Sequence, residues 1–134
     1  MFGTSYANRA SAYARVGTET SVDAASPHKL ILMLYDGALL ALGTALVAVR
    51  NKDIPTKGQS ISKAINIIDN GLKVSLDMNA GGDLAGRLNA LYEYMSERLL
   101  YANLHSSEAA LNEVINLLSS LREAWAGIAE QAAA

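Results

Sequence analysis

The sequence predicts an all-α protein, an antiparallel up-and-down four-helix bundle with a mobile N-terminal arm. Two observations indicate this fold class. Apolar residues recur at alternating three- and four-residue spacings in four separate stretches, which is the period of one helix face, and no stretch alternates as a half-buried strand does. Short polar connections separate the stretches, so consecutive helices are expected to be antiparallel neighbours. We assign residues 1–25 to a flexible arm and residues 26–131 to the bundle.

The longest apolar stretch, residues 26–49, is expected to form the helix on which the others pack. Ser26 can accept a hydrogen bond from a first-turn N–H, and Pro27 occupies the first helical position, where its missing N–H costs nothing. Met33, Leu40 and several other leucines lie off the main apolar face, so this helix is apolar on more than one side and needs several neighbours. The main face carries Ile31, Tyr35, Ala38, Leu42, Ala45 and Val49.

The same stretch is long enough to span a bilayer, since roughly 20 apolar residues suffice. Asp36 lies within it and would be expensive in hydrocarbon, and residues 37–48 are rich in alanine and glycine. We therefore expect a buried helix of a bundle and no membrane insertion.

Two further helices follow on the C-terminal side of a polar connection. Thr56 is expected to cap the second helix, which should end near Asn79 because the pair Gly81-Gly82 breaks a helix cheaply. Asp83 is expected to cap the third. The second helix carries Ile61, Ile65, Ile68, Leu72 and Leu76 on one face. The third carries Leu84, Leu88, Leu91, Met95, Leu99 and Ala102.

The fourth helix is expected to begin after Ser106 and Ser107, with Glu108 placed favourably against its N-terminus. Its apolar face alternates three- and four-residue steps and fades into an alanine-rich tail. This face carries Leu111, Val114, Leu118, Leu121, Trp125 and Ile128.

Composition excludes several classes of function. The chain has no cysteine, which rules out thiol chemistry and a Cys-type zinc site. Its 11 basic and 13 acidic residues give a net charge of −2 without any basic block, so nucleic-acid binding is not expected. The N-terminus lacks an apolar segment after a basic start, so we expect no secretory signal and a cytoplasmic location.

The chain shows no recognisable catalytic pattern. A di-iron bundle needs Glu-x-x-His pairs, and none occurs; His28 and His105 lie near helix ends and are expected to be solvated. The pair Gly81-Gly82 lacks the following Lys-Ser/Thr of a phosphate loop. We therefore predict that the protein is not an enzyme and needs no metal or cofactor.

Surplus apolar and aromatic surface is the more informative feature. The chain has six tyrosines and one phenylalanine, and tyrosine suits surfaces that are alternately wet and covered. A wide core would absorb any one of the residues in excess of a single stripe, but as a set they favour a groove that receives a partner's helix. These residues are Ile67, Val74, Tyr92, Tyr94 and Tyr101.

The sequence also resembles the FliS family of flagellar export chaperones. The resemblance runs from Ala12 onward and rests on five blocks taken together: ASP at residues 25–27 with MLYDGAL at 33–39, SKAINIIDNGLKVSLD at 62–77, the Gly81-Gly82 break, LYEYMSERLLYAN at 91–103 and EVINLLSSLREAW at 113–125.

The resemblance implies a chaperone in the bacterial cytoplasm that binds the disordered C-terminal segment of flagellin, prevents premature polymerisation and presents it to a component of the flagellar type III export gate. It also implies that the arm, where Tyr13 looks like the family's arm tyrosine, covers part of the binding surface when flagellin is absent. A self-associating helical scaffold or adaptor is the alternative. We expect the partner surface to comprise Tyr13, Ile67, Gly71, Val74, Tyr92, Tyr94, Tyr101 and Asn103.

Overall fold

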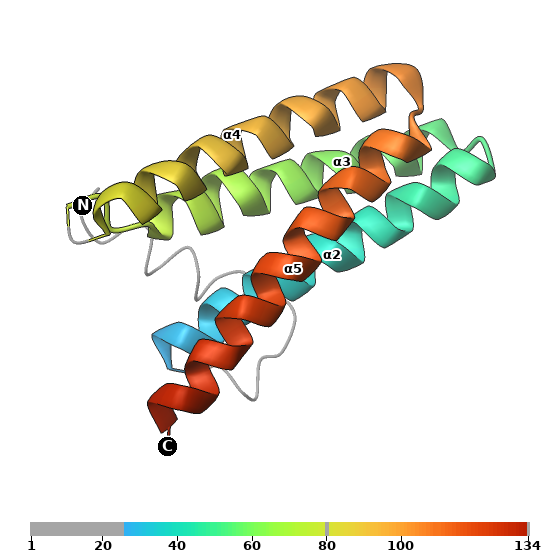
Figure 1. Ribbon diagram of the computed structural model, residues 1–134. Coiled ribbons are helices and arrows are strands. Elements are labelled where there is room, and N and C mark those ends of the chain that lie inside the picture. The colour runs from blue at the N-terminus through green and yellow to red at the C-terminus, as the bar shows by residue number, and fades with distance from the viewer. Residues whose placement is uncertain (1–25, 80, 134) are drawn as a thin grey trace.

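The computed structural model describes residues 26–79 and 81–133, which form four long α-helices and no strand. The helices are α2 (Pro27–Arg50), α3 (Ile54–Ile67), α4 (Gly82–His105) and α5 (Glu108–Ala133) (Figure 1). The predicted all-α fold class and four-helix bundle are confirmed. The predicted arm, residues 1–25, lies outside the described residues, so the boundary between arm and bundle stays a prediction.

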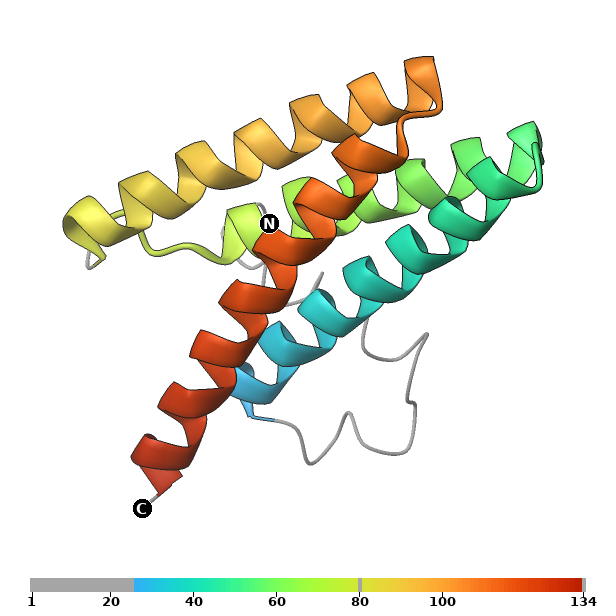
Figure 2. The same cartoon turned by 45° about the vertical axis from the view of Figure 1, so that its right-hand side comes forward.

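The four helices form two pairs that meet at one end of the molecule. In Figures 1 and 2, α3 and α4 run side by side, and α2 and α5 run side by side in a different direction. The α2–α3 and α4–α5 connections lie together at the end where the pairs converge. The start of α2 and the end of α5 lie at the other end, where the pairs separate.

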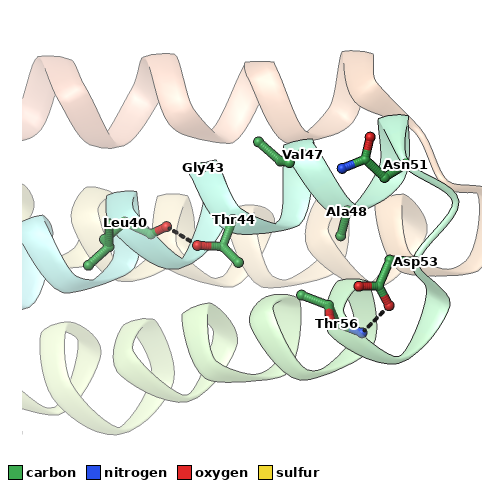
Figure 3. Close-up of a pocket in the computed structure, with 8 residues that line it drawn as sticks. All are labelled: Leu40, Gly43, Thr44, Val47, Ala48, Asn51, Asp53 and Thr56. Atoms are coloured by element: carbon green, nitrogen blue, oxygen red, sulfur yellow. Dashed lines mark hydrogen bonds between the residues drawn. The ribbon is translucent and has the colours of Figure 1, made fainter.

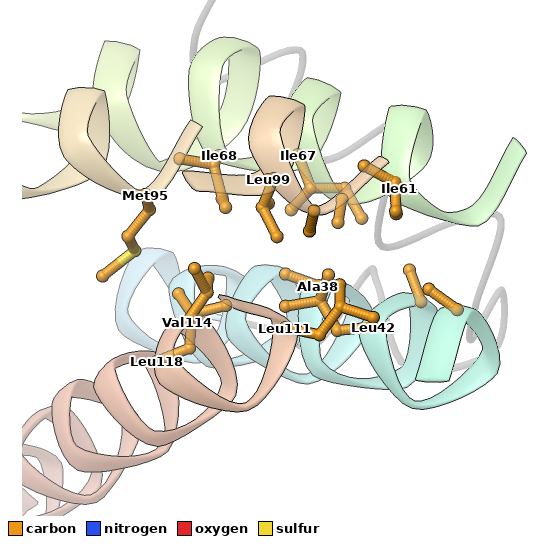
Figure 4. Close-up of a cluster of buried hydrophobic side chains, with 14 of the residues drawn as sticks. Ala38, Leu42, Ile61, Ile67, Ile68, Met95, Leu99, Leu111, Val114 and Leu118 are labelled. Carbon is orange, nitrogen blue, oxygen red and sulfur yellow. The ribbon is translucent and has the colours of Figure 1, made fainter. Parts of the chain in front are cut away.

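The core lies between these pairs, and its side chains come from all four helices (Figure 4). α2 packs against both α3 and α5, as its broad apolar surface predicts. Each large apolar side chain that is fully buried contributes roughly 1.5–3 kcal/mol by leaving water. The largest of them are Leu34, Leu42, Ile61, Ile68, Leu72, Met95, Leu99, Leu111, Val114 and Leu118.

The start of α2 follows the sequence prediction. Ser26 precedes the helix with extended backbone angles, and its Oγ accepts a hydrogen bond from the Lys29 N–H at 3.2 Å. Pro27 occupies the first helical position. The side-chain cap satisfies one of the N–H groups that the first turn leaves unpaired.

The caps predicted for the next two helices are wrong. Asp53 caps α3, because its Oδ1 accepts the hydrogen bond from the Thr56 N–H at 3.2 Å. Hydrogen bonding to the Thr56 side chain, and then to its N–H, lowers the pKa of that carboxyl group. Gly81 precedes α4 without any side-chain cap, and Asp83 lies in the first turn, where its charge favours the positive pole of the helix. Leu84, predicted on the core face of this helix, is exposed.

The second predicted helix ends earlier than expected and is irregular. After α3 the chain forms a wider π-helical turn, η2 (Ile68–Leu72), and a tighter 3-10 turn, η3 (Lys73–Ser75), rather than continuing to Asn79. A Cβ at Gly71 would lie only 3.1 Å from Leu34 Cδ2, so Leu34 packs directly on the glycine backbone. The wider turn accompanies burial of both Ile67 and Ile68.

Polar contacts tie the two connections at the convergent end. Lys57 is buried, and its Nζ donates a hydrogen bond to Ser106 Oγ at 2.8 Å. Arg50 Nε donates to Glu108 Oε1 at 3.0 Å on the surface nearby. A buried amine without such a partner would be strongly unfavourable, so the Lys57–Ser106 bond helps to fix the α3 start against the α4–α5 turn.

α2 is also the one helix in the described part of the chain that is long and apolar enough to cross a membrane by length and composition alone. A single helix of this kind is weak support for a membrane span, because core helices of bundles have the same composition. In this structure 33% of its most apolar stretch is buried against other helices.

Candidate partner-binding surfaces

The outward face of α2 carries an open apolar groove. Leu40 is 73% exposed and Val47 is 54% exposed, and between them Gly43 presents bare backbone. Figure 3 shows these residues along one side of the helix, with Thr56 of α3 across from its C-terminal end. The hollow has a volume of about 380 Å³, within the ~300–1,000 Å³ typical of ligand pockets. Its lining consists of Leu40, Gly43, Thr44, Val47, Ala48, Asn51, Asp53 and Thr56.

A second surface lies along α4 where it faces the start of α5. Glu113 of α5 accepts hydrogen bonds from the Tyr94 hydroxyl and, at 2.8 Å, from Arg98 Nε. The Arg98 guanidinium lies 4.7 Å from the centre of the Tyr101 ring, and that ring is 4.4 Å from the His105 ring. These residues form a continuous row, which we call the α4 tyrosine row.

The charges in the α4 tyrosine row stabilise one another. The Tyr94 hydrogen bond and then the Arg98 hydrogen bond lower the pKa of Glu113, while the same contact raises the pKa of Tyr94. The Arg98–Tyr101 geometry is that of a cation–π contact. The row therefore holds two exposed tyrosine rings in fixed positions on the surface.

The structure divides the sequence-predicted partner residues into three groups. Tyr94 and Tyr101 are exposed, and Val74 and Asn103 are half-buried. Ile67, Gly71 and Tyr92 are buried, so in this conformation they support the surface from beneath and offer no side chain to a partner. Tyr13 lies outside the described residues.

Tyr92 is buried because it pairs with Tyr35 of α2. The two hydroxyl oxygens lie 2.5 Å apart, so one donates a hydrogen bond to the other inside the core. Burial raises the pKa of Tyr35, although the hydrogen bond opposes that shift; burial and then the neighbouring Tyr35 raise the pKa of Tyr92. Both phenols remain neutral over a wide pH range, because burial disfavours the charged phenolate form.

The groove on α2 was not among the predicted partner residues. The available signal was that Leu40 lies off the main apolar face, which indicated only that the helix needs more than one neighbour. Sequence periodicity could not tell which apolar face remains open after α3 and α5 have packed. The structure shows that it is the face of Leu40 and Val47.

His28 differs from the prediction that both histidines are solvated. Its half-buried ring stacks on Trp125 with centroids 4.4 Å apart, and Trp125 Nε1 donates to the His28 carbonyl at 3.0 Å. His105 is exposed. Within residues 26–79 and 81–133, no three His, Asp or Glu side chains gather as metal ligands would.

The fold and these surfaces define a small all-α protein that presents apolar and aromatic helix faces, the kind of surface that receives another protein's helix. The family model of the flagellar protein FliS matches residues 9–132. The chain belongs to the FliS family.

Curated relatives match most of the chain. It is 51% identical over 121 residues to the flagellar secretion chaperone FliS of Salmonella typhimurium strain LT2, covering 90% of each protein. Identity to the protein of the same name from Escherichia coli K12 is 46%, over 85% of this chain and 84% of the relative. For Bacillus subtilis strain 168 it is 35%, over 80% and 78% respectively.

Proposed function

We propose that this protein is a cytoplasmic secretion chaperone that binds the disordered C-terminal segment of flagellin, prevents its premature polymerisation and delivers it to the flagellar type III export apparatus. The relatives are named flagellar secretion chaperones, which supports the class of function. The observation that carries the proposal to this chain is the exposed apolar groove of α2 together with the α4 tyrosine row.

Surfaces of this kind suit a client that folds on binding. A disordered segment can wrap a large area, while the cost of ordering it offsets much of the contact energy. The resulting modest net affinity favours release at the export gate. We assign Val74, Tyr94, Tyr101 and Asn103 to direct contact, Tyr13 to the arm, and Ile67, Gly71 and Tyr92 to support of the surface from the core.

The test is a titration of the purified protein with a peptide of the last ~40 residues of flagellin from the same organism, followed by circular dichroism, since coupled folding adds ordered structure. We expect a saturable gain in helix beyond the sum of the separate spectra, with heat released in isothermal titration. No heat and no gain in helicity from a well-folded protein would refute the proposal.

Substitutions on the α4 tyrosine row test the assigned surface. Tyr101→Ala removes an exposed ring and should weaken peptide binding by about ten-fold, the loss of a moderate interface residue. The matched control is Lys63→Ala, which shortens an exposed side chain on the polar side of α3. Equal affinities of the two variants would show that the row is not part of the client surface.

A self-associating scaffold is the second candidate, because the exposed apolar face of α2 is also suited to a second copy of the chain. Sedimentation velocity separates the two. The scaffold predicts a tight oligomer that flagellin peptide leaves unchanged, whereas the chaperone predicts a complex of the protein with the peptide.

A further inference from the structure

The sequence contains one Asn-Gly pair, Asn70-Gly71, and it lies in the π-helical turn η2. Asparagine followed by glycine is the pair most prone to lose its side-chain amide spontaneously, because glycine has no Cβ to obstruct attack by its own backbone nitrogen. Asn70 is exposed, and its Nδ2 donates a hydrogen bond to Asn66 Oδ1 on the same surface. Asn70 therefore has the chemistry and the exposure of a modification site, and the backbone around it decides whether it reacts.

The backbone around Asn70 is irregular. A regular α-helix suppresses the reaction, because every N–H is tied to the carbonyl four residues back. Here the Lys73 N–H bonds to the Ile68 carbonyl, five residues back, and the Leu76 N–H bonds to the Lys73 carbonyl, three residues back. Such turns have poorer hydrogen bonds than an α-helix, so this segment opens at a lower free energy than α3 does. Because Gly71 is buried, its nitrogen reaches the Asn70 amide only during such an opening.

We propose that Asn70 is a site of spontaneous deamidation, which proceeds when the η2 turn opens. The Gly71 backbone nitrogen forms a bond to Asn70 Cγ and gives up its proton, the Cγ–Nδ2 bond breaks, and the amide group leaves with that proton as ammonia. Water then opens the resulting succinimide ring at either carbonyl, which gives aspartate or isoaspartate. The reaction needs water alone and no enzyme or cofactor.

Both products disturb the packing at Gly71. A Cβ on Gly71 would lie only 3.1 Å from Leu34 Cδ2, so the core tolerates little displacement of this backbone. Isoaspartate routes the chain through the former side chain and adds one backbone atom next to the glycine. Aspartate keeps the backbone, but it places a carboxylate beside Asp69 and turns an acceptor toward the Asn66 oxygen that now accepts a hydrogen bond.

The consequence for the client rests on the proposed function. Val74, assigned to direct contact with flagellin, lies one turn beyond Asn70, and Gly71 supports that surface from beneath. Displacement of the turn moves both, so a converted chain should hold its client less tightly. The modification would give the client surface a limited chemical lifetime, because deamidation is not reversed by the protein itself.

The first test follows the covalent change and needs no flagellin. Folded protein is kept at mildly alkaline pH, which favours attack by the amide nitrogen, and is sampled for peptide mapping by mass spectrometry. We expect Asn70 to convert about ten-fold or more faster than Asn51, an exposed asparagine in a turn that is followed by Lys52 rather than by glycine.

The same protein in urea gives the rate without the fold, so the ratio of the two rates measures how often the turn opens. Conversion of Asn70 in urea but not in the folded protein would overturn the inference. A rate at Asn70 in the folded protein no higher than that at Asn51 would overturn it too.

The second test measures the consequence. Converted protein, separated from unconverted protein by its extra negative charge, should bind the flagellin peptide about ten-fold more weakly. Asn70→Gln keeps an amide on a longer side chain and, after the same incubation, should retain its affinity, which controls for other damage. Wild-type affinity of the converted protein would overturn the inference. Failure of fresh wild-type protein to bind the peptide would instead refute the proposed function and leave the modification site standing.

Discussion

α2 and α4 are both 24 residues long, but their outward faces are built differently. On α2 the exposed side chains are aliphatic, Leu40 and Val47, and flank a bare glycine. On α4 two exposed tyrosines, Tyr94 and Tyr101, are bound through Glu113 and Arg98 into the tyrosine row. The same helix also has exposed leucines outside the row, at positions 84, 100 and 104. The difference shows that exposed apolar surface can be either free or already restrained by neighbours.

The restrained surface and the free surface would contribute differently to the free energy of covering them with a partner. Tyrosine rings held by polar contacts lose little conformational freedom when a partner covers them. An open aliphatic groove gains mainly by losing water. The following predictions test this distinction, starting with the largest expected effect.

The largest expected effect is the difference in stability between a substitution on the buried face of α2 and one on its exposed face. Leu42 is fully buried, so Leu42→Ala should lower the free energy of unfolding by about 2–5 kcal/mol through lost burial and a cavity. Leu40→Ala on the exposed face should change it by no more than about 0.5 kcal/mol. Urea unfolding measures both. Similar losses would mean that the outward face of α2 is covered in solution.

Breaking the Tyr35–Tyr92 hydrogen bond between α2 and α4 should cause the next largest loss in the free energy of unfolding. Tyr92→Phe leaves the Tyr35 hydroxyl buried without its partner, and should lower the free energy of unfolding by about 1–3 kcal/mol. The double variant with Tyr35→Phe removes both hydroxyls, so it should be less destabilised than the sum of the single variants. Simple addition of the two losses would contradict a shared hydrogen bond.

The same pair predicts a dependence on alkaline pH. Burial raises the folded-state pKa of Tyr35 and Tyr92 above the ordinary value of 10.0. Their contribution to the free energy of unfolding is therefore complete below pH 10 and is lost as the pH rises above that value. Between pH 8 and higher pH, the free energy of unfolding should decline less steeply for the Tyr35→Phe/Tyr92→Phe double variant than for the wild-type protein. The other tyrosines are common to both proteins, which makes the comparison specific.

The smallest effect should come from releasing the α4 tyrosine row. Glu113→Gln weakens its bonds to Tyr94 and Arg98, and because all three are on the surface the urea midpoint should fall only slightly. The pKa of Glu113 is lowered, so its contribution exists above about pH 4.5 and disappears as pH falls below that value. The difference in urea midpoint between Glu113→Gln and the wild-type protein should therefore vanish in acid.

The sequence contained enough information for the elements that local chemistry determines. Ser26 and Pro27 mark the start of α2, and Glu108 marks the first turn of α5, because caps and helix dipoles act within one turn. Apolar periodicity predicted most of the core face of each helix, but Leu84 near the start of α4 and Ile128 near the end of α5, both predicted to face the core, are exposed. The cap predictions failed for Thr56 and Asp83, because Asp53 and Gly81 occupy the cap positions of α3 and α4.

The remaining features depend on contacts between distant residues. Tyr92 is buried because it meets Tyr35, and His28 is covered because it meets Trp125. The π-helical turn lies where Leu34 of α2 packs on Gly71. Such pairings have no local pattern, so the sequence predicted a tyrosine-rich partner surface but could not show that Tyr92 and Ile67 lie beneath it.

The contact between His28 and Trp125 gives the protein a built-in optical reporter. Trp125 is the chain's single tryptophan, so all tryptophan fluorescence of the protein comes from the junction of the first turn of α2 with the distal part of α5. A client confined to the surroundings of Gly43 would leave the emission spectrum unchanged. A client that extends to the start of α2 would separate the stacked rings of His28 and Trp125 and shift the emission maximum. The emission maximum therefore reports how far along α2 the client reaches.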